Sequence, residues 1–153
     1  MYRSLSLLFL VLVSCNSKPD LKAEEQIIRN MLATERKAHF ERNADLFVSE
    51  FSDSMLSINR GKVKLTPPDT MRKSISKYFN SVSFVKWDDL AKPIIRFSED
   101  GKMAYAVVQK QVIVSRPDSL GNPVLDSTQY AWVSVYRKVK GAWKVEANVS
   151  TNK

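Results

Sequence analysis

The pattern of hydrophobic and polar positions is most regular near the C-terminus. Small or branched apolar residues occupy every second position of two neighbouring runs there. A period of two is typical of strands that bury one face, so we predict strands over Ser127–Lys138 and Ala142–Ser150. Lys140-Gly141 supplies the turn between them. Because an isolated hairpin is marginally stable in water, the earlier segments must cover its apolar face.

The helical period occurs in the first half of the chain. From Leu21 to Glu41 the apolar residues fall near one face at about 100° per residue, and Asp20 can cap the start of this helix. A second, short helix is predicted over Ala44–Phe51. A third begins after Thr66, which can serve as its N-cap, and ends near Asn80.

Shorter extended runs surround the third helix. We predict strands over Met55–Ile58, Val63–Leu65, Val82–Phe97 and Met103–Ser115. Pro93 cannot donate a ladder hydrogen bond, so a bend, a bulge or an edge position is expected beside it. All four glycines fall in predicted turns between strands, which leaves none for a loop that cradles phosphate. The sequence therefore excludes the glycine-rich nucleotide-binding fingerprints.

An apolar run, Leu5–Val13, follows the first basic residue of the chain. It is shorter than the ~20 residues that a membrane-spanning helix needs, and it is typical of the apolar region of a secretory signal. The residues that end it, Leu12-Val13-Ser14-Cys15, resemble a bacterial lipobox. The alternative is a cysteine that happens to close an ordinary secretory signal.

The lipobox resemblance implies that Cys15 is acylated and that the peptide before it is removed. The domain boundaries predicted from it are a signal peptide over residues 1–14, a lipidated cysteine with a polar tether over residues 15–20, and a folded domain over residues 21–153. The protein is then exported to the cell envelope, where membrane lipid anchors it, facing the periplasm. Because Cys15 is the only cysteine, no thiol remains for a disulfide, a metal or catalysis.

The formal net charge is +8, and the basic residues are scattered except for one cluster around the C-terminal turn. The cluster comprises Arg137, Lys138, Lys140 and Lys144. It forms either a solvated basic surface or a patch that attracts anionic lipid head groups. No nucleic-acid-binding motif accompanies it, so nucleic acid is not an expected partner.

Four segments of the predicted domain carry a resemblance to a known superfamily. They are Phe51-Ser52-Asp53, Ser98–Ala104, Ala131–Val135 and Lys140–Val145. With the order of the predicted elements, they resemble the nuclear transport factor 2-like superfamily, in its SnoaL-like and domain-of-unknown-function branches. The resemblance implies an α+β fold, with a cone-shaped, strongly curved antiparallel sheet, three helices on its concave face and a conical cavity. The superfamily contains isomerases, dehydratases, hydrolases and binding modules, so the fold alone does not decide the activity.

The resemblance also places possible acid–base groups on the cavity wall. It puts the base of the family isomerases near Asn59 and their first-helix hydrogen-bond donor near Glu35. Because an asparagine cannot abstract a proton, the departure at Asn59 argues against steroid-isomerase chemistry.

Glu35 with His39 is the candidate catalytic pair. Glu35 follows Ile28 by seven positions and so lies near the middle of the apolar stripe of the first helix, with His39 beside it. A carboxylate desolvated by a cavity becomes a usable acid or base, and the histidine could share its proton. Alternatively, Glu35 reaches the cavity mouth and binds a backbone amide, an arginine or His39. A lone histidine without a free cysteine makes a weak metal site, so we expect no metal and no cofactor.

Four further residues are cavity-lining candidates: Met31, Asn59, Trp87 and Tyr105. Tyr105 belongs to a polar row of its strand that lines either the cavity or a solvated outer face. Trp87 precedes two aspartates, but adjacent strand residues point to opposite faces, so these do not form a carboxylate pair.

Trp132 and Tyr136 alternate out of phase with Val133 and Val135. If the valines face the core, the two aromatic residues face outward and are candidates for the interface of a homodimer. The alternative is that the stems of neighbouring lysines shield them.

We therefore expect an exported lipoprotein whose single domain binds a small hydrophobic or amphipathic ligand, or a protein partner. Two other functions stay open. One is a cofactor-free dehydratase, isomerase or hydrolase that uses Glu35 and His39. The other is a scaffolding protein that acts through the face of Trp132 and Tyr136.

Overall fold

A computed structural model describes residues 19–153 of the chain. The predicted signal peptide, Cys15 and most of the tether lie outside the described residues. The elements are α1 (Leu21–Phe40), α2 (Ala44–Val48), β1 (Phe51–Asn59), β2 (Lys62–Thr66), α3 (Pro68–Ser81), β3 (Ser83–Asp89), β4 (Ile94–Phe97), β5 (Met103–Pro117), β6 (Pro123–Val139) and β7 (Ala142–Asn152).

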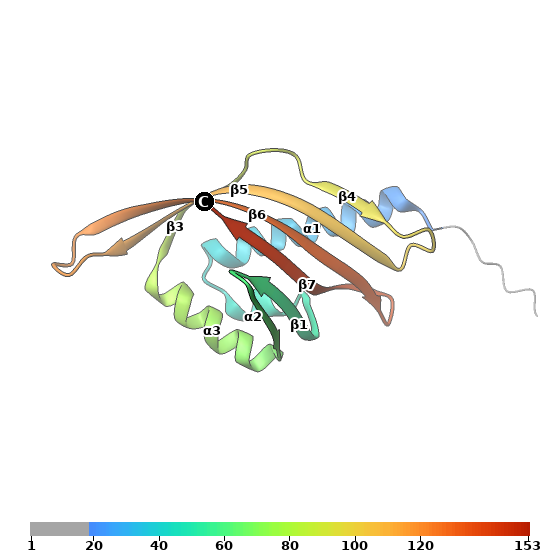
Figure 1. The fold of residues 1–153 in the computed structure, drawn as a ribbon, viewed down its shortest axis with the longest axis horizontal. Coiled ribbons are helices and arrows are strands. Elements are labelled where there is room, and N and C mark those ends of the chain that lie inside the picture. Colours follow the sequence, from blue (N-terminus) through green and yellow to red (C-terminus); the bar gives the residue numbers. More distant parts are fainter. Residues whose placement is uncertain (1–18) are drawn as a thin grey trace, which may run out of the picture.

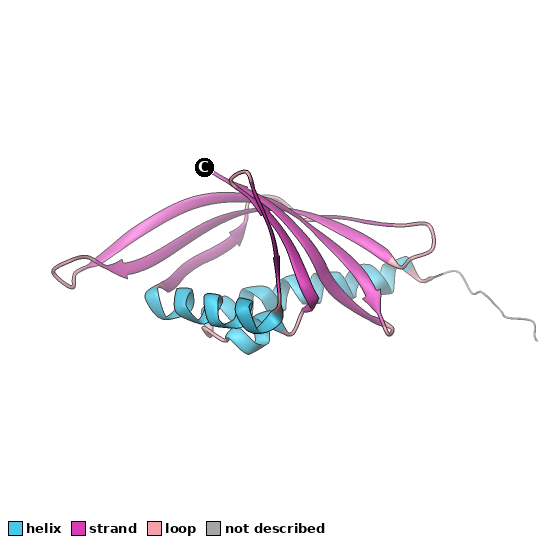
Figure 2. Ribbon diagram, turned by 60° about the horizontal axis from the view of Figure 1, so that its bottom comes forward, coloured by secondary structure: helices cyan, strands magenta, loops and turns pink. Residues whose placement is uncertain are grey.

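The fold is α+β, as predicted. The seven strands form one curved sheet in the order β2-β1-β7-β6-β5-β3, with β4 paired to a further part of β5. The three helices lie together on one side of this sheet (Figures 1 and 2). Since the sheet curves over them, its inner face and the helices enclose the core.

One pairing departs from the predicted antiparallel sheet. β1 and β7 run parallel, whereas the other strand pairs are antiparallel. The last strand, β7, lies between β6 and β1, so the end of the chain pairs with its first strand. It brings Ser57 and Asn59 beside Asn148 and Ser150, which places four polar side chains together at one end of the sheet.

Two acidic residues fix the start of α1. The side chain of Asp20 accepts hydrogen bonds from the backbone N–H groups of Lys22 and Ala23, as predicted for an N-cap. Glu24, one turn further, accepts hydrogen bonds from Lys138 Nζ and Trp143 Nε1. These contacts fix the start of α1 against the β6–β7 hairpin and so set the position of the helix along the sheet.

Several predicted boundaries change, and one predicted interruption is confirmed. α2 ends at Val48, and β1 begins at Phe51, so the short helix is shorter than predicted. The N-cap of α3 is Pro67, without a side-chain cap, where Thr66 was expected. The extended run over residues 82–97 is divided into β3 and β4 on either side of Pro93, which agrees with the predicted interruption.

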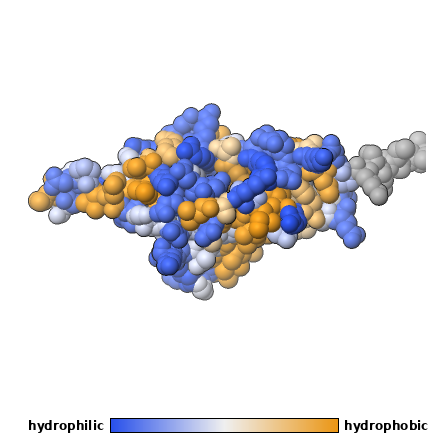
Figure 3. Space-filling view, turned by 90° about the horizontal axis from the view of Figure 1, so that it is seen from above, coloured by the Kyte–Doolittle hydropathy of each residue, from blue (hydrophilic) through white to orange (hydrophobic). Residues whose placement is uncertain are grey.

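The β5–β6 hairpin is long and protrudes from the body of the molecule, at the left of Figure 1. Hydrophobic side chains are visible on this protruding part in Figure 3. They include Leu120 and Leu125, which are 84% and 64% exposed. The predicted strands end at Ser115 and begin again at Ser127, so this arm was not predicted; β5 continues to Pro117 and β6 begins at Pro123.

Candidate functional site

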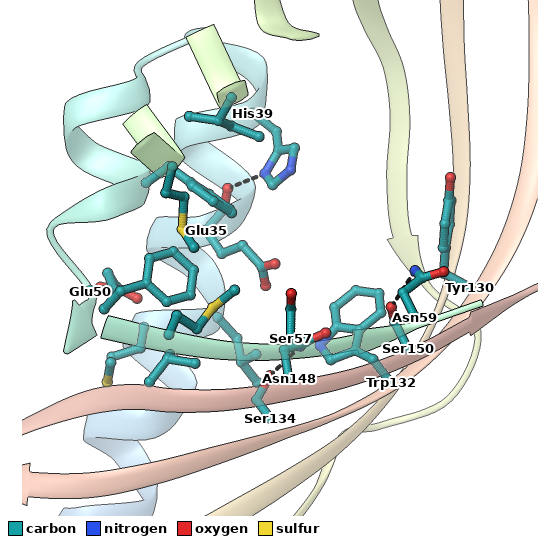
Figure 4. A pocket seen from close by; sticks show the side chains of 18 of the residues that line it. Glu35, His39, Glu50, Ser57, Asn59, Tyr130, Trp132, Ser134, Asn148 and Ser150 are labelled. Atoms are coloured by element: carbon teal, nitrogen blue, oxygen red, sulfur yellow. Dashed lines mark hydrogen bonds between the residues drawn. The ribbon is translucent and has the colours of Figure 1, made fainter. Parts of the chain in front are cut away.

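A cavity of about 590 Å³ lies between the helices and the inner face of the sheet. Its walls are mostly apolar and aromatic, from Met31, Leu32, Phe47, Phe51, Met55, Met71, Ile75, Tyr78, Trp87, Val112, Tyr130, Trp132, Tyr136 and Val145. Two carboxyl groups and a small set of hydroxyl and amide groups interrupt this surface (Figure 4). A concave, largely apolar space with a few polar groups is the usual form of a small-molecule site.

Glu35 projects from α1 into this cavity (Figure 4). Ile28, seven residues earlier on the same apolar stripe, is fully buried, but the stripe alone left open whether Glu35 enters the cavity or reaches its mouth. Within residues 19–153 no hydrogen bond joins the Glu35 carboxylate to another group. Burial raises the pKa of the carboxyl to about 7, against the opposing effect of the Lys110 charge, while Asp89 adds to the increase. Glu35 therefore exchanges a proton near neutral pH.

An ion pair with one buried partner lies near Glu35. Lys110 is on the inward-facing row of β5, only 3% exposed, and its Nζ donates a hydrogen bond to Asp89 at the end of β3. The neighbouring Asp88 instead lies 3.7 Å from Arg36 NH2. The two aspartates thus have different partners, as their positions on a strand predicted.

Glu50 is a second acid in the cavity, and the sequence analysis missed it. It lies in the turn between α2 and β1, where its backbone carbonyl accepts a hydrogen bond from Val145 N at 2.8 Å. Burial raises the pKa of its carboxyl to about 8; the Glu35 carboxylate adds to this, and Lys144 opposes it. No periodic signal marks this residue, because the predicted helix extended through it to Phe51.

His39 does not share the proton of Glu35, contrary to our hypothesis. Its Nδ1 lies 2.7 Å from the Glu35 backbone carbonyl oxygen, to which it must donate because a carbonyl only accepts. The ring stacks on Trp87, with centroids 3.8 Å apart, and Phe47, Phe79 and Phe84 meet it at their edges. Burial lowers the pKa of His39 to about 4. Near neutral pH the residue is therefore a neutral member of an aromatic cluster.

The other cavity-lining candidates divide into three that line the cavity and one that does not. Met31, Asn59 and Trp87 contribute to the cavity wall. Tyr105 was wrong as a lining residue: it points from the outer face of β5 and is 44% exposed. The inward row of β5 is the even-numbered one, from Ala104 to Val114.

The predicted interface residues also lie on the other face. Trp132 and Tyr136 are 8% and 2% exposed and line the cavity, so they are not on an outer surface. The valines between them, Val133 and Val135, face outward in their place. An outer face that does carry exposed apolar residues is formed by Ile94, Met103, Tyr105, Val107 and Val149. The homodimer stays a prediction, and it would have to use this outer face.

A β-bulge is part of the reason why Trp132 and Tyr136 face inward and not outward as predicted. Val135 pairs with Ala147 and Tyr136 with Val145, so Glu146 is an extra residue on β7. Before the bulge Val145 faces the cavity, and after it Asn148 does. The apolar alternation across Val145 and Val149 therefore does not describe one face of the sheet.

Uncharged polar groups occupy the part of the cavity that β1, β6 and β7 form. Asn59 Nδ2 donates to Ser150 Oγ at 2.7 Å, and Asn148 Nδ2 donates to Ser134 Oγ at 3.0 Å. Ser57 lies between these pairs (Figure 4). Trp87 Nε1 is buried and has no hydrogen-bond partner in the described part of the chain.

Residues 19–153 contain no group of three or more His, Cys, Asp or Glu side chains placed to hold a metal ion. Nor does any helix within these residues have the length and apolar character to cross a membrane.

Comparison with known proteins was made by sequence and by structure. No family model matches the sequence, and no curated protein matches it. A ketosteroid isomerase-like protein from Erwinia carotovora atroseptica superposes with a TM-score of 0.63 at 13% identity, covering 84% of this chain and 95% of that one. A putative dehydratase of the NTF2-like family from Streptomyces avermitilis gives 0.69 at 10% identity, covering 84% and 96%.

A third similar structure is an NTF2-like protein from Cytophaga hutchinsonii, with a TM-score of 0.66 at 14% identity, covering 85% of this chain and 98% of that one. At these identities the likeness concerns the fold, and the activities named for the neighbours are theirs. The order of elements, the curved sheet and these superpositions together show that the chain has the nuclear transport factor 2-like, cystatin-like fold.

Proposed function

We propose that this protein is an exported, membrane-tethered module that binds one small amphipathic ligand in the cavity beneath its sheet. The observation that carries the proposal is the cavity itself, about 590 Å³ in volume, with aromatic walls and a few convergent polar groups. The cavity also argues against a scaffold that acts through Trp132 and Tyr136, because both residues belong to its wall.

Binding is favoured over catalysis by the partners of the polar groups. Asn59 lies at the position where the resemblance implies a base. Its side-chain amide donates a hydrogen bond to Ser150 and is not basic enough to accept a proton from a substrate. His39 is held by a backbone carbonyl. The side chains of Asn59 and His39 are therefore held in hydrogen bonds within the protein.

A cofactor-free enzyme is the second candidate, and one observation favours it. The pKa of Glu35 lies near 7, where a carboxyl group can both accept and donate a proton, and Glu50 is a second acid in the same cavity. In this candidate Glu50 replaces His39 as the partner. Once a substrate is found, Glu35→Gln should abolish turnover but still bind Nile red, a neutral dye that fluoresces in apolar surroundings. Unchanged turnover would remove Glu35 from the mechanism.

The ligand proposal predicts that the cavity can be blocked from one side chain. Ser57 projects from β1 into the cavity, and Ser57→Phe should occupy the space near Trp132. We expect the affinity for Nile red to fall by about tenfold or more, because a phenyl ring displaces the dye. Fluorescence titration measures this loss.

The matched control is Ser127→Phe, which adds the same ring to an exposed position of β6. It should leave dye binding unchanged. Equal binding by Ser57→Phe and by the unaltered protein, with both folded by circular dichroism, would show that the dye does not enter the cavity.

The membrane tether is proposed from the N-terminal residues, which lie outside the described part of the chain. The apolar run before Cys15 and the small Ser14 support it. Cys15→Ala should abolish labelling with radioactive palmitate in the native host, because Cys15 is the proposed site of acylation. The protein should also move from the membrane fraction to a soluble fraction, since stable anchoring depends on the acyl chains attached there.

Ser17→Ala is the control for this substitution, since it changes a neighbouring polar residue and leaves the thiol in place. It should behave like the unaltered protein in both assays. Retention of Cys15→Ala in the membrane fraction, or palmitate labelling without the thiol, would contradict lipidation at this residue.

A further inference from the structure

Acidic groups line the cavity, whereas the chain as a whole is basic. The full sequence carries a formal net charge of +8, with 24 basic and 16 acidic residues. Yet the lining residues of the described chain include two carboxyl groups, Glu35 and Glu50, and neither a lysine nor an arginine. A buried carboxylate without a counter-ion is costly, so a cavity with two of them favours a ligand that supplies positive charge.

The nearby lysines are engaged elsewhere. Lys110 forms its ion pair with Asp89, near Glu35. Lys144 Nζ donates a hydrogen bond to the Ser49 backbone carbonyl at 2.5 Å. Neither lysine lies within ion-pair distance of Glu35 or Glu50 in the described chain. The two acids therefore have no cation of the protein in contact, and they retain protons near neutral pH for the same reason.

The walls of the cavity are also suited to a cation. The rings of Phe47 and Phe51 contact one another, with centroids 5.0 Å apart. Phe51 directly follows Glu50 in the sequence. Trp132 projects into the space that Glu35 faces (Figure 4). The faces of aromatic rings carry negative electrostatic potential, and they attract ammonium groups more strongly when water is excluded.

One buried donor lacks an acceptor. Trp87 is 8% exposed and lines the cavity, and its Nε1 has no partner within residues 19–153. The atom itself is inaccessible to water, so it lies within the wall and not at the surface that a ligand meets. The polar contacts open to a ligand on the sheet side are the hydroxyl and amide groups of Ser57, Asn148 and Ser150.

From these observations we infer that the ligand is an organic cation, an amine carried on an aromatic or aliphatic body. The ammonium group lies between Glu35 and Glu50, and the apolar body packs on the aromatic wall. This inference rests on the proposed ligand-binding function and gives it a substrate class.

The test compares three probes that share an indole ring and differ in charge. Tryptamine is a cation near neutral pH, tryptophol is neutral, and indoleacetate is an anion. Each competes with Nile red for the purified domain at about pH 7. We expect tryptamine to bind about tenfold or more tightly than tryptophol, and indoleacetate to bind most weakly, because the buried acids repel it.

The preference should depend on the two acids. In the double variant Glu35→Gln with Glu50→Gln the ratio of tryptamine to tryptophol affinity should fall below about threefold, since the neutral amides keep the shape and remove the charge. Glu50→Gln alone should reduce the ratio partly and serves as a second variant. The control is Glu99→Gln, which removes one exposed carboxylate outside the cavity and should leave the ratio unchanged.

The outcomes separate this inference from the proposed function. If Nile red and tryptophol bind and tryptamine shows no advantage, or if indoleacetate binds best, the cation inference is wrong and the binding function stands. If the ratio persists in the double variant, the acids do not select the ligand, and the inference is also wrong. If neither the dye nor any probe binds, both the inference and the binding function are contradicted.

Discussion

The free energy of unfolding is expected to fall by about 2 to 3 kcal/mol as the pH rises from about 6 to about 9. The cause is the pair of cavity acids, Glu35 and Glu50, whose pKa values in the folded protein are raised to about 7 and about 8. Their stabilising effect is fully present below the pKa of an ordinary glutamic acid. It is lost as the pH rises through the raised values, because the folded protein must then release protons that the unfolded chain has already released.

His39 acts in the opposite direction. Its pKa in the folded protein is lowered to about 4, so the unfolded chain binds more protons below its ordinary value, and this contribution to stability grows as the pH rises toward about 6.5. Above that pH the imidazole is neutral in both states, and the two acids dominate. The expected fall includes this compensation and a smaller contribution from Glu50, which is partly exposed to solvent.

Urea unfolding followed by circular dichroism at several pH values measures this dependence, if the transition is two-state. The double variant Glu35→Gln with Glu50→Gln should show an almost flat profile above about pH 6.5 and should exceed the unaltered protein in stability at about pH 9. Glu99→Gln, at an exposed turn, should keep the original slope. A flat profile for the unaltered protein would show that the two carboxyl groups are not desolvated.

Phe79→Ala is expected to lower the free energy of unfolding by about 3 to 5 kcal/mol. Phe79 is fully buried on α3, and its ring contacts those of His39 and Phe84 with centroids 5.2 and 5.9 Å apart. Removing the ring leaves a hole beneath the aromatic cluster that joins α3 to α1 and β3. The surrounding rings are too large to close it without leaving their favoured contacts.

The matched control is Phe40→Ala, at the end of α1, where the ring is 38% exposed and lies beneath Arg36. That variant should lose about 1 kcal/mol, because less of its surface is withdrawn from water than at Phe79 and its removal leaves no enclosed hole. Urea unfolding at fixed pH compares the two. Losses of similar size would indicate that the aromatic cluster is not the main contact between α3 and the rest of the domain.

Local patterns were sufficient for much of the fold. The apolar stripe of the first helix, Asp20 at its start, the turn at Lys140-Gly141 and the interruption at Pro93 were all predicted and are confirmed. Each depends on neighbours within a few residues, through backbone hydrogen bonding and the period of the side chains. The same stripe marked Glu35 as unusual but left open whether its carboxyl group enters the cavity.

The site required contacts between residues far apart in the sequence. Glu50 became a cavity acid because its turn lies against Val145, and His39 lost its proposed role because its hydrogen bond goes to a carbonyl of its own helix. Neither contact leaves a periodic signal.

The sequence by itself determined the type and order of most helices and strands, and the lipobox-like residues around Cys15 are visible only there. The tertiary structure alone decided which side of the sheet is the inside. Both faces of β6 carry apolar residues, so alternation shows that Trp132 and Val133 point in opposite directions without showing which is covered. The helices settle the choice, because they pack on the face of Trp132, and a single extra residue at Glu146 changes the phase on the neighbouring strand.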